Sequence, residues 1–270
     1  MTENLIAELL RHSKAIAKLR VLDNSRPDFI CYDGLSICWE NCIFPSRNAI
    51  YVNEPLLSPL ALQVCVSKAA EYIRNKDYPG LLYLCEEYHQ AIPDDICREI
   101  LIREGFELQG KLIGMSAIIS LSQFQSDLEL VRLRFERAQG SSVLKDFAAI
   151  YSLAYDKELE KGRASMPGKQ FWNDTTFAYV GYLDGQPVST AAGIKNENCL
   201  YLTYVATHPD FQRQGFAREA ILHTLKQSYE ASSVDHTVLY STSDGFQLYK
   251  RLGYQPVAVF NVYLLENSST

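Results

Sequence analysis

The chain has 270 residues, enough for two domains of roughly 100–150 residues each. Its composition, 47% hydrophobic and 21% charged, is that of a globular protein and excludes a disordered, collagen-like or disulfide-scaffold chain. The net charge of −6 comes from 12 basic and 16 acidic residues up to residue 120 and from 14 and 16 beyond it, which argues against nucleic acid as a partner.

The first part of the chain shows a mixture of helical and strand-like patterns. Apolar residues at helical spacing predict a helix over residues 3–20. Strands are then expected at 29–31, 37–39, 50–52 and 81–85, and helices at 60–74 and 93–104. Residues 106–119 have an extended pattern, and the polar, aperiodic stretch that follows them predicts a linker at 121–128.

The second part, from residue 129 to 270, has the pattern β-α-β-β-β-α-β-α-β. It opens with an alternating strand at 128–136 and a helix at 144–155, and residues 161–169 look like a polar loop. Asp184-Gly185 predicts a hairpin between strands 177–183 and 188–195. The remaining elements are expected at 199–207, 215–229, 237–240, 246–252 and 257–265. Hairpins mixed with helix crossovers predict the α/β class, with a mixed (α+β) sheet.

Several features bear on where the protein resides. No uncharged apolar stretch reaches the roughly 18 residues of a membrane span. Glu3 and Glu8 stand where a secretory signal would be basic and then apolar. The seven cysteines are odd in number and lack metal-ligand spacing. We therefore expect a cytoplasmic protein with reduced thiols, no bound metal and no membrane partner.

The strongest motif is a strand that runs through a proline into a loop whose glycine opens a helix. It reads Tyr201-Leu-Thr-Tyr-Val-Ala-Thr-His-Pro-Asp-Phe-Gln-Arg-Gln-Gly-Phe-Ala217. Backbone N–H groups in the first turn of a helix have no intrahelical partner and, with the helix dipole, form a site for an anion such as a pyrophosphate. Gly215 allows close approach of such a group, and Arg213 and Arg218 add positive charge.

Residues 129–266 resemble the GNAT superfamily of N-acetyltransferases. The family's acetyl-CoA motif, [Gln/Arg]-x-x-Gly-x-[Gly/Ala], stands here as Gln212-Arg-Gln-Gly-Phe-Ala217, and its later Tyr-x-x-x-Gly-aromatic signature as Tyr249-Lys-Arg-Leu-Gly-Tyr254. The resemblance implies acetyl-CoA as co-substrate and two strands that splay apart around its pantetheine arm. It assigns the cofactor to Val205, Ala206, Thr207, Gln212, Arg213, Gln214, Gly215, Phe216, Ala217, Arg218 and Thr242.

The resemblance also bears on the chemistry. It places Tyr249 at the general-acid position, and a phenol with a pKa near 10 can protonate the departing thiolate at neutral pH. Thr242 stands where many relatives have an Asn, so a hydroxyl would have to substitute for the amide in that contact. No acidic residue lies in 198–207, where many relatives carry a Glu as base. Glu197, His208 and Asp244 are the candidates, and water or an already neutral amine fits equally well.

The first part repeats some of the same pattern in weaker form. Leu101-Ile-Arg-Glu-Gly-Phe106 parallels Tyr249–Tyr254, but Leu101 replaces the tyrosine and residues 55–70 contain no glycine. We interpret the chain as tandem GNAT-like modules, with a degenerate copy at 1–120 that lacks the CoA loop, a linker at 121–128 and an acetyl-CoA-binding domain at 129–270. Chance similarity of two helix–Gly–strand units is the alternative.

Two functions fit the sequence. The first is an N-acetyltransferase that transfers an acetyl group from acetyl-CoA to a primary amine of a small molecule or peptide by direct attack. The alternative is a non-catalytic acyl-CoA-binding or interaction module. The sequence leaves open the acceptor and the oligomeric state, for which a monomer with pseudo-dimeric modules is one alternative.

Overall fold

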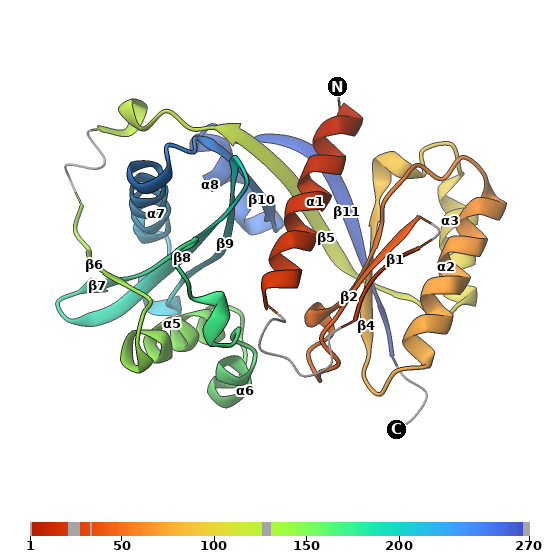
Figure 1. Cartoon of the computed structure of the whole chain (residues 1–270), viewed down its shortest axis with the longest axis horizontal. Helices are drawn as coiled ribbons and strands as arrows, with labels where there is room; N and C mark the ends of the chain where they lie inside the picture. Colours follow the sequence, from red (N-terminus) through yellow and green to blue (C-terminus); the bar gives the residue numbers. More distant parts are fainter. Residues whose placement is uncertain (1, 21–27, 33, 126–130, 267–270) are drawn as a thin grey trace. The chain divides into compact units, whose positions relative to one another are not determined.

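The structure is a computed structural model that describes residues 2–20, 28–32, 34–125 and 131–266. The chain forms two compact units (Figure 1). Unit 1 contains residues 1–115, 240–247 and 256–270, and unit 2 contains residues 116–239 and 248–255. The module boundaries expected from the sequence stay a prediction, and residues 126–128 of the expected linker lie outside the described residues.

Unit 1 contains a mixed sheet in the strand order β1-β2-β3-β4-β11-β5. Strands β1, β2 and β3 are antiparallel, β3 and β4 run parallel, and β11 is antiparallel to β4. The strands span Asp28–Tyr32 (β1), Leu35–Trp39 (β2), Asn48–Val52 (β3), Gly80–Cys85 (β4), Gln255–Leu265 (β11) and Glu107–Ile118 (β5). The last strand of the chain thus lies inside the sheet of the first unit.

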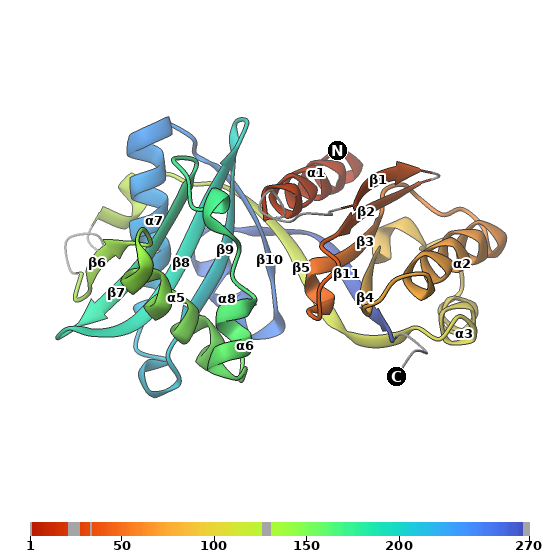
Figure 2. The same ribbon diagram turned by 60° about the horizontal axis from the view of Figure 1, so that its bottom comes forward.

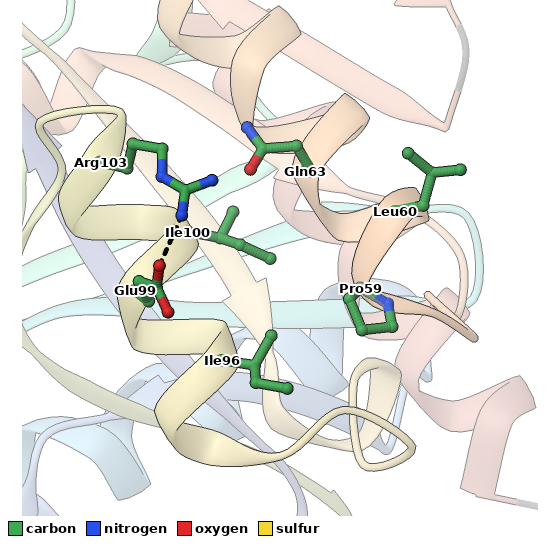
Figure 3. Close-up of a pocket in the computed structure, with 7 residues that line it drawn as sticks. All are labelled: Pro59, Leu60, Gln63, Ile96, Glu99, Ile100 and Arg103. Carbon is green, nitrogen blue, oxygen red and sulfur yellow. Dashed lines mark hydrogen bonds and ion pairs between the residues drawn. The ribbon is translucent and has the colours of Figure 1, made fainter.

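Three helices cover this sheet. Helix α1 (Thr2–Arg20) packs on one face, and α2 (Pro59–Arg74) and α3 (Asp94–Arg103) lie side by side on the other (Figures 1, 2 and 3). Their apolar faces meet a core of β2, β3 and β4 in which Trp39 and Ile50 are fully buried. The helices and strands expected in this part of the sequence are confirmed.

Unit 2 contains a sheet in the order β10-β9-β8-β7-β6, antiparallel except for the parallel pair β9 and β10. The strands span Arg134–Arg137 (β6), Thr176–Leu183 (β7), Gln186–Asn196 (β8), Cys199–Thr207 (β9) and His236–Ser241 (β10). Helices α5 (Ser141–Ala154) and α7 (Phe216–Ser232) cover opposite faces (Figure 2). Successive side chains of β7 point to opposite faces of the sheet, so both faces need a covering helix. Val180 packs with α5, while Tyr179 contacts His223 of α7.

The expected element order and the mixed α/β class are confirmed, with two local differences. The strand expected at 128–136 is shorter, since β6 begins at Arg134 and residues 126–130 lie outside the described part. The stretch expected as a loop contains helix α6 (Leu159–Ala164) and a 3₁₀ helix, η4 (Lys169–Phe171). Gly162 lets α6 approach α5, because a Cβ there would meet the side chain of Ser152.

Candidate active site

The site begins where β9 loses its pairing with β10. The two parallel strands are paired at Leu200 with Thr237 and at Tyr201 with Val238. From residue 202 onward β9 has no paired residue on β10 in the described part of the chain, although β9 continues to Thr207. The expected Val205, Ala206 and Thr207 lie on this stretch. Its backbone edge is therefore available to an extended ligand, which could pair with it as an added strand would.

A β-bulge interrupts the other edge of the same stretch. The register with β8 passes from Thr203–Ala192 to Ala206–Thr190, so two residues of β9 oppose one of β8. Tyr204 takes a φ of 50°, a left-handed conformation that is uncommon for a side chain of its size. The Thr190 hydroxyl donates to the Tyr204 carbonyl at 2.9 Å and stabilises the bulge. Backbone strain is thus concentrated beside the unpaired edge.

The loop after β9 ends in an open helix N-terminus. Gly215 is the N-cap of α7 with φ 90°, and no side chain caps the helix. The N–H groups of residues 216–218 consequently have no intrahelical acceptor. Gly215 is exposed, and a Cβ there would stand 3.4 Å from Nη2 of Arg132. The residues present fit a pyrophosphate, because free N–H donors, a helix dipole and a glycine coincide.

The expected cofactor residues contribute in different ways. The Phe216 side chain is buried and packs on Leu133 and Val188, so only its backbone can reach a ligand. Gln212 donates to the Thr207 carbonyl at 3.4 Å and is exposed. Arg213, Gln214, Ala217 and Arg218 lie on the same loop and first helical turn. The guanidinium of Arg218 stacks over the Phe124 ring at 5.4 Å.

An ion pair that sequence reasoning missed braces this loop. Arg132 donates to a Glu219 carboxylate oxygen at 2.8 Å and to the Gln214 carbonyl at 2.5 Å. The same carboxylate accepts the backbone N–H groups of Arg132 and Leu133. Glu219 is acidic in the first turn of α7, yet its charge is compensated there. The bonded residues are 86 or more positions apart in the sequence, so no local sequence pattern could have revealed this contact.

Tyr249 lies on helix α8 (Ser243–Arg251) with its side chain 8% exposed. Burial raises the pKa of its phenol well above the usual value near 10, and the phenols of Tyr155, Tyr254 and Tyr201 surround it. Its hydroxyl makes no hydrogen bond to any described residue. Tyr155 in turn donates to the Val205 carbonyl at 3.3 Å, which links this group of phenols to the unpaired stretch of β9. A phenol held protonated here can serve as a proton donor.

The candidate bases are scattered. Glu197 lies in the turn between β8 and β9, about 26 Å along the strand from Val205 at the usual rise per residue. His208 precedes η5 (Pro209–Phe211), and its Nδ1 accepts the Asp210 N–H at 3.3 Å. Asp244 and Thr242 are exposed and are counted with unit 1. Their roles stay predictions.

An aromatic cluster beside the bulge was not expected from the sequence. Tyr204 packs on Phe147 at 5.8 Å, on Tyr151 at 5.2 Å and on Trp172 at 6.4 Å between ring centroids. Tyr151 also contacts Tyr155 at 4.7 Å. These rings come from α5, β9 and the segment after α6. The only local signal was the density of aromatic residues, which is equally typical of a core.

The described residues contain neither a metal-binding cluster nor a membrane-spanning helix. No group of three or more His, Cys, Asp or Glu side chains there is arranged to hold a metal ion. No helix in the described ranges is both long and apolar enough to cross a membrane.

The fold and the site together define an α/β protein in which an open helix N-terminus follows an unpaired strand edge. Residues 144–254 match the family model described as "Acetyltransferase (GNAT) family". This part of the chain is therefore a GNAT domain, as the sequence resemblance indicated. No curated protein sequence matches the chain.

Solved structures extend the likeness over the whole chain. A GCN5-related N-acetyltransferase from Kribbella flavida is 16% identical with a TM-score of 0.65, covering 95% of this chain and 96% of that one. A functionally unknown conserved protein from Staphylococcus epidermidis has the same identity and TM-score, covering 89% and 94%. A tandem GNAT protein from the clavulanic acid biosynthesis pathway is 12% identical with a TM-score of 0.59, covering 100% and 96%. The tandem GNAT fold is thus confirmed.

Proposed function

We propose that this protein is an N-acetyltransferase that transfers the acetyl group of acetyl-CoA to a primary amine by direct attack. One observation carries the proposal: the unpaired stretch of β9 leads directly into the uncapped, glycine-led N-terminus of α7. The helix N-terminus suits the pyrophosphate of acetyl-CoA, with Arg213 and Arg218 beside it. The edge at Val205–Thr207 suits the amides of the pantetheine arm.

In the proposed reaction the amine nitrogen attacks the thioester carbonyl carbon, and the carbon–sulfur bond breaks as the thiolate leaves. Tyr249 donates its phenolic proton to the thiolate, and the amine proton passes to water. Burial keeps that phenol protonated at neutral pH. Water serves as the base in this proposal because Glu197 lies far along β9 from the bulge and His208 already accepts a backbone N–H.

The acceptor class rests on the family, whose members act on amines. The aromatic cluster around Tyr204 lies beside the bulge and supplies apolar surface for the body of an acceptor. All seven cysteines are free thiols, which suits a reducing compartment, so the proposal places the reaction in the cytoplasm.

The test is an acetyl-CoA turnover screen over a broad panel of primary amines, read by release of free thiol. We expect at least one amine to give thiol release above that of acetyl-CoA alone. The competing proposal, a non-catalytic acyl-CoA-binding module, predicts binding of acetyl-CoA without thiol release for any amine. A panel that yields binding but no turnover would favour that alternative.

A further inference from the structure

Unit 1 contains a cavity of about 750 Å³ that the proposed acetyl transfer does not use. It is bounded by the segment after β4, by α3, by the beginning of β5 and by β11. Its volume falls within the range of small-molecule sites. Leu101, Phe106 and Tyr263 contribute apolar surface to its wall, and Lys111 and Glu86 form an ion pair at 2.6 Å on it.

Two buried polar side chains line this cavity without a protein partner. His89 is 7% exposed, and neither of its ring nitrogens has a hydrogen-bond partner among the described residues. Asn261 is also 7% exposed, and its amide oxygen is equally unpartnered within the part of the chain described. Buried polar atoms are nearly always hydrogen-bonded in native proteins, so two such side chains on one cavity indicate a ligand.

The local fold fixes the positions of both residues. His89 follows the 3₁₀ helix η2 (Glu86–Tyr88), where its N–H donates to the Glu86 carbonyl and its carbonyl accepts the Ile92 N–H. Asn261 lies opposite Leu84 in the antiparallel pair of β11 and β4. Because side chains alternate along a strand, Asn261 and Tyr263 share the face that lines the cavity. These backbone pairings hold both residues at the wall of the cavity.

The chemistry of the two groups indicates what they would bind. Burial lowers the pKa of His89, so its imidazole is neutral at pH 7 and offers one N–H donor and one acceptor nitrogen. The Asn261 amide likewise offers a donor and an acceptor. Neither group carries a charge to pair with an ion. A planar, uncharged group that presents a donor beside an acceptor is complementary to both, as when an Asn binds the edge of a nucleobase.

A second pocket in the same unit provides a contrast. The groove between α2 and α3 measures about 270 Å³, and Figure 3 shows Glu99 and Arg103 of α3 paired along one side of it. That ion pair is 2.5 Å long, and Gln63 donates to Ser67 and Glu104. Its polar groups are thus satisfied by the protein itself.

We propose that the cavity lined by His89 and Asn261 is a binding site for a small uncharged ligand with a planar carboxamide or lactam edge. The ligand's N–H group donates to Oδ1 of Asn261, and its carbonyl accepts from the imidazole N–H of His89. Its ring or chain packs on Phe106 and Leu101. The degenerate module thereby has a ligand of its own that is distinct from acetyl-CoA.

The experiment titrates the full-length protein with benzamide, nicotinamide and uracil, using ligand-observed NMR. Benzoate and nicotinate serve as matched anions of the first two compounds. At least one amide is expected to bind. Its matched anion or its N,N-dimethyl derivative should bind with an affinity at least ten-fold lower. Asn261→Leu and His89→Phe are each expected to weaken that amide at least ten-fold. Leu108→Ala, an exposed residue on the same cavity, should change its affinity less than two-fold.

A thermal unfolding measurement distinguishes a binding role from a structural one. Asn261→Leu removes an unpartnered buried oxygen, so the ligand-free variant should unfold at a higher temperature than the wild type. Acetyl-CoA binding should be unchanged in both variants, which keeps this test independent of the proposed acetyl transfer. Failure of all three amides to bind, or binding that survives both substitutions, would overturn the proposal.

Discussion

Two neighbouring tyrosines of the GNAT signature are both buried, but their hydroxyls differ in hydrogen bonding. Tyr254 is fully buried, and its hydroxyl accepts a hydrogen bond from Thr237 at 2.8 Å. Tyr249 lies 5.8 Å away between ring centroids, and its hydroxyl has no hydrogen-bond partner in the described ranges. Burial raises the pKa of both phenols. Only Tyr249 therefore has a hydroxyl that is uncommitted and available to a reacting group.

The substitution Tyr249→Phe tests this difference, because it removes one oxygen and keeps the ring. With an acceptor from the amine screen and saturating acetyl-CoA, we expect turnover to fall by about 10²–10⁴-fold, the usual effect of a positioned acid. Affinity for acetyl-CoA should change little. Tyr254→Phe is the matched control and should cost about 1 kcal/mol of stability with turnover nearly unchanged. If Tyr249→Phe keeps at least half of wild-type turnover, proton delivery belongs to water.

Helix α7 combines a buried face with an open N-terminus. One face of the helix is buried through Phe216, Ala220, Ile221 and Leu225. Burial of this face anchors the helix, while the Arg132–Glu219 contacts hold its first turn. The N–H groups of that turn are thereby kept in place without a capping side chain. The same helix carries the half-buried His223, whose ring stacks on Phe135 at 4.2 Å.

His223 makes the stability of the fold depend on pH. Burial lowers the pKa of its imidazole from 6.5 to about 4. Because the unfolded chain then binds the proton more readily, this contribution to stability is full above pH 6.5 and is lost as pH falls toward 4. The slope is at most about 1.4 kcal/mol per pH unit. In urea unfolding at pH 7 and pH 5, His223→Gln should lose less stability between the two pH values than the wild type does.

The control for this prediction is His208→Gln, which replaces an imidazole in the loop before η5. Its stability difference between pH 7 and pH 5 is the reference with which the His223→Gln result is compared. An identical difference for His223→Gln and wild type would show that His223 does not titrate as described.

At the scale of the whole molecule, the last strand of the chain completes the sheet of the first unit. Strand β11 pairs with β4 from Phe260–Cys85 to Leu265–Gly80. The Glu87 carboxylate accepts the Val259 N–H at 3.2 Å. Gly114 of β5 faces Phe260 so closely that a Cβ would lie 3.2 Å from the ring. Unit 1 therefore depends on residues that follow unit 2 in the chain.

Residues 1–120 expressed alone should accordingly fail to unfold cooperatively, since the edges of β4 and β5 would be exposed. Appending residues 256–266 through a flexible linker should restore cooperative thermal unfolding measured by circular dichroism. Appending the same eleven residues in scrambled order is the control and should not. Cooperative unfolding of residues 1–120 alone, at the same temperature as the fusion, would contradict this account of β11.

The helix ends of the two modules show what the sequence could predict. Gly105 and Gly253 both end a helix with positive φ, and Phe106 N–H bonds to the Leu101 carbonyl as Tyr254 N–H does to Tyr249. Such local turns, and the element order, follow from spacing and glycine position. The bulge at Tyr204, the Arg132–Glu219 pair and the place of β11 depend on partners distant in the chain. No local pattern encodes those partners, so sequence reasoning missed them.

The degenerate module differs from the GNAT domain at the corresponding helix start. Ser58 caps α2 by accepting the Ala61 N–H at 3.2 Å, and Pro59 supplies no N–H in the first turn. Strands β3 and β4 stay paired from Ala49–Leu81 to Tyr51–Tyr83, close to the end of β3. Neither the open N-terminus nor the unpaired edge is present in these described residues. We therefore predict that any CoA site of the chain lies in the GNAT domain alone.

Calorimetric titration with acetyl-CoA shows whether the cofactor binds at the glycine-led start of α7, as we propose. The full-length wild type should bind one acetyl-CoA per chain. Gly215→Glu places a side chain and a negative charge at the anion site, and its binding heat should vanish. Gly185→Glu is the matched control, because Gly185 also has positive φ and is exposed but lies in the β7–β8 turn, and it should bind as the wild type does. Undiminished binding of acetyl-CoA by Gly215→Glu would contradict the account.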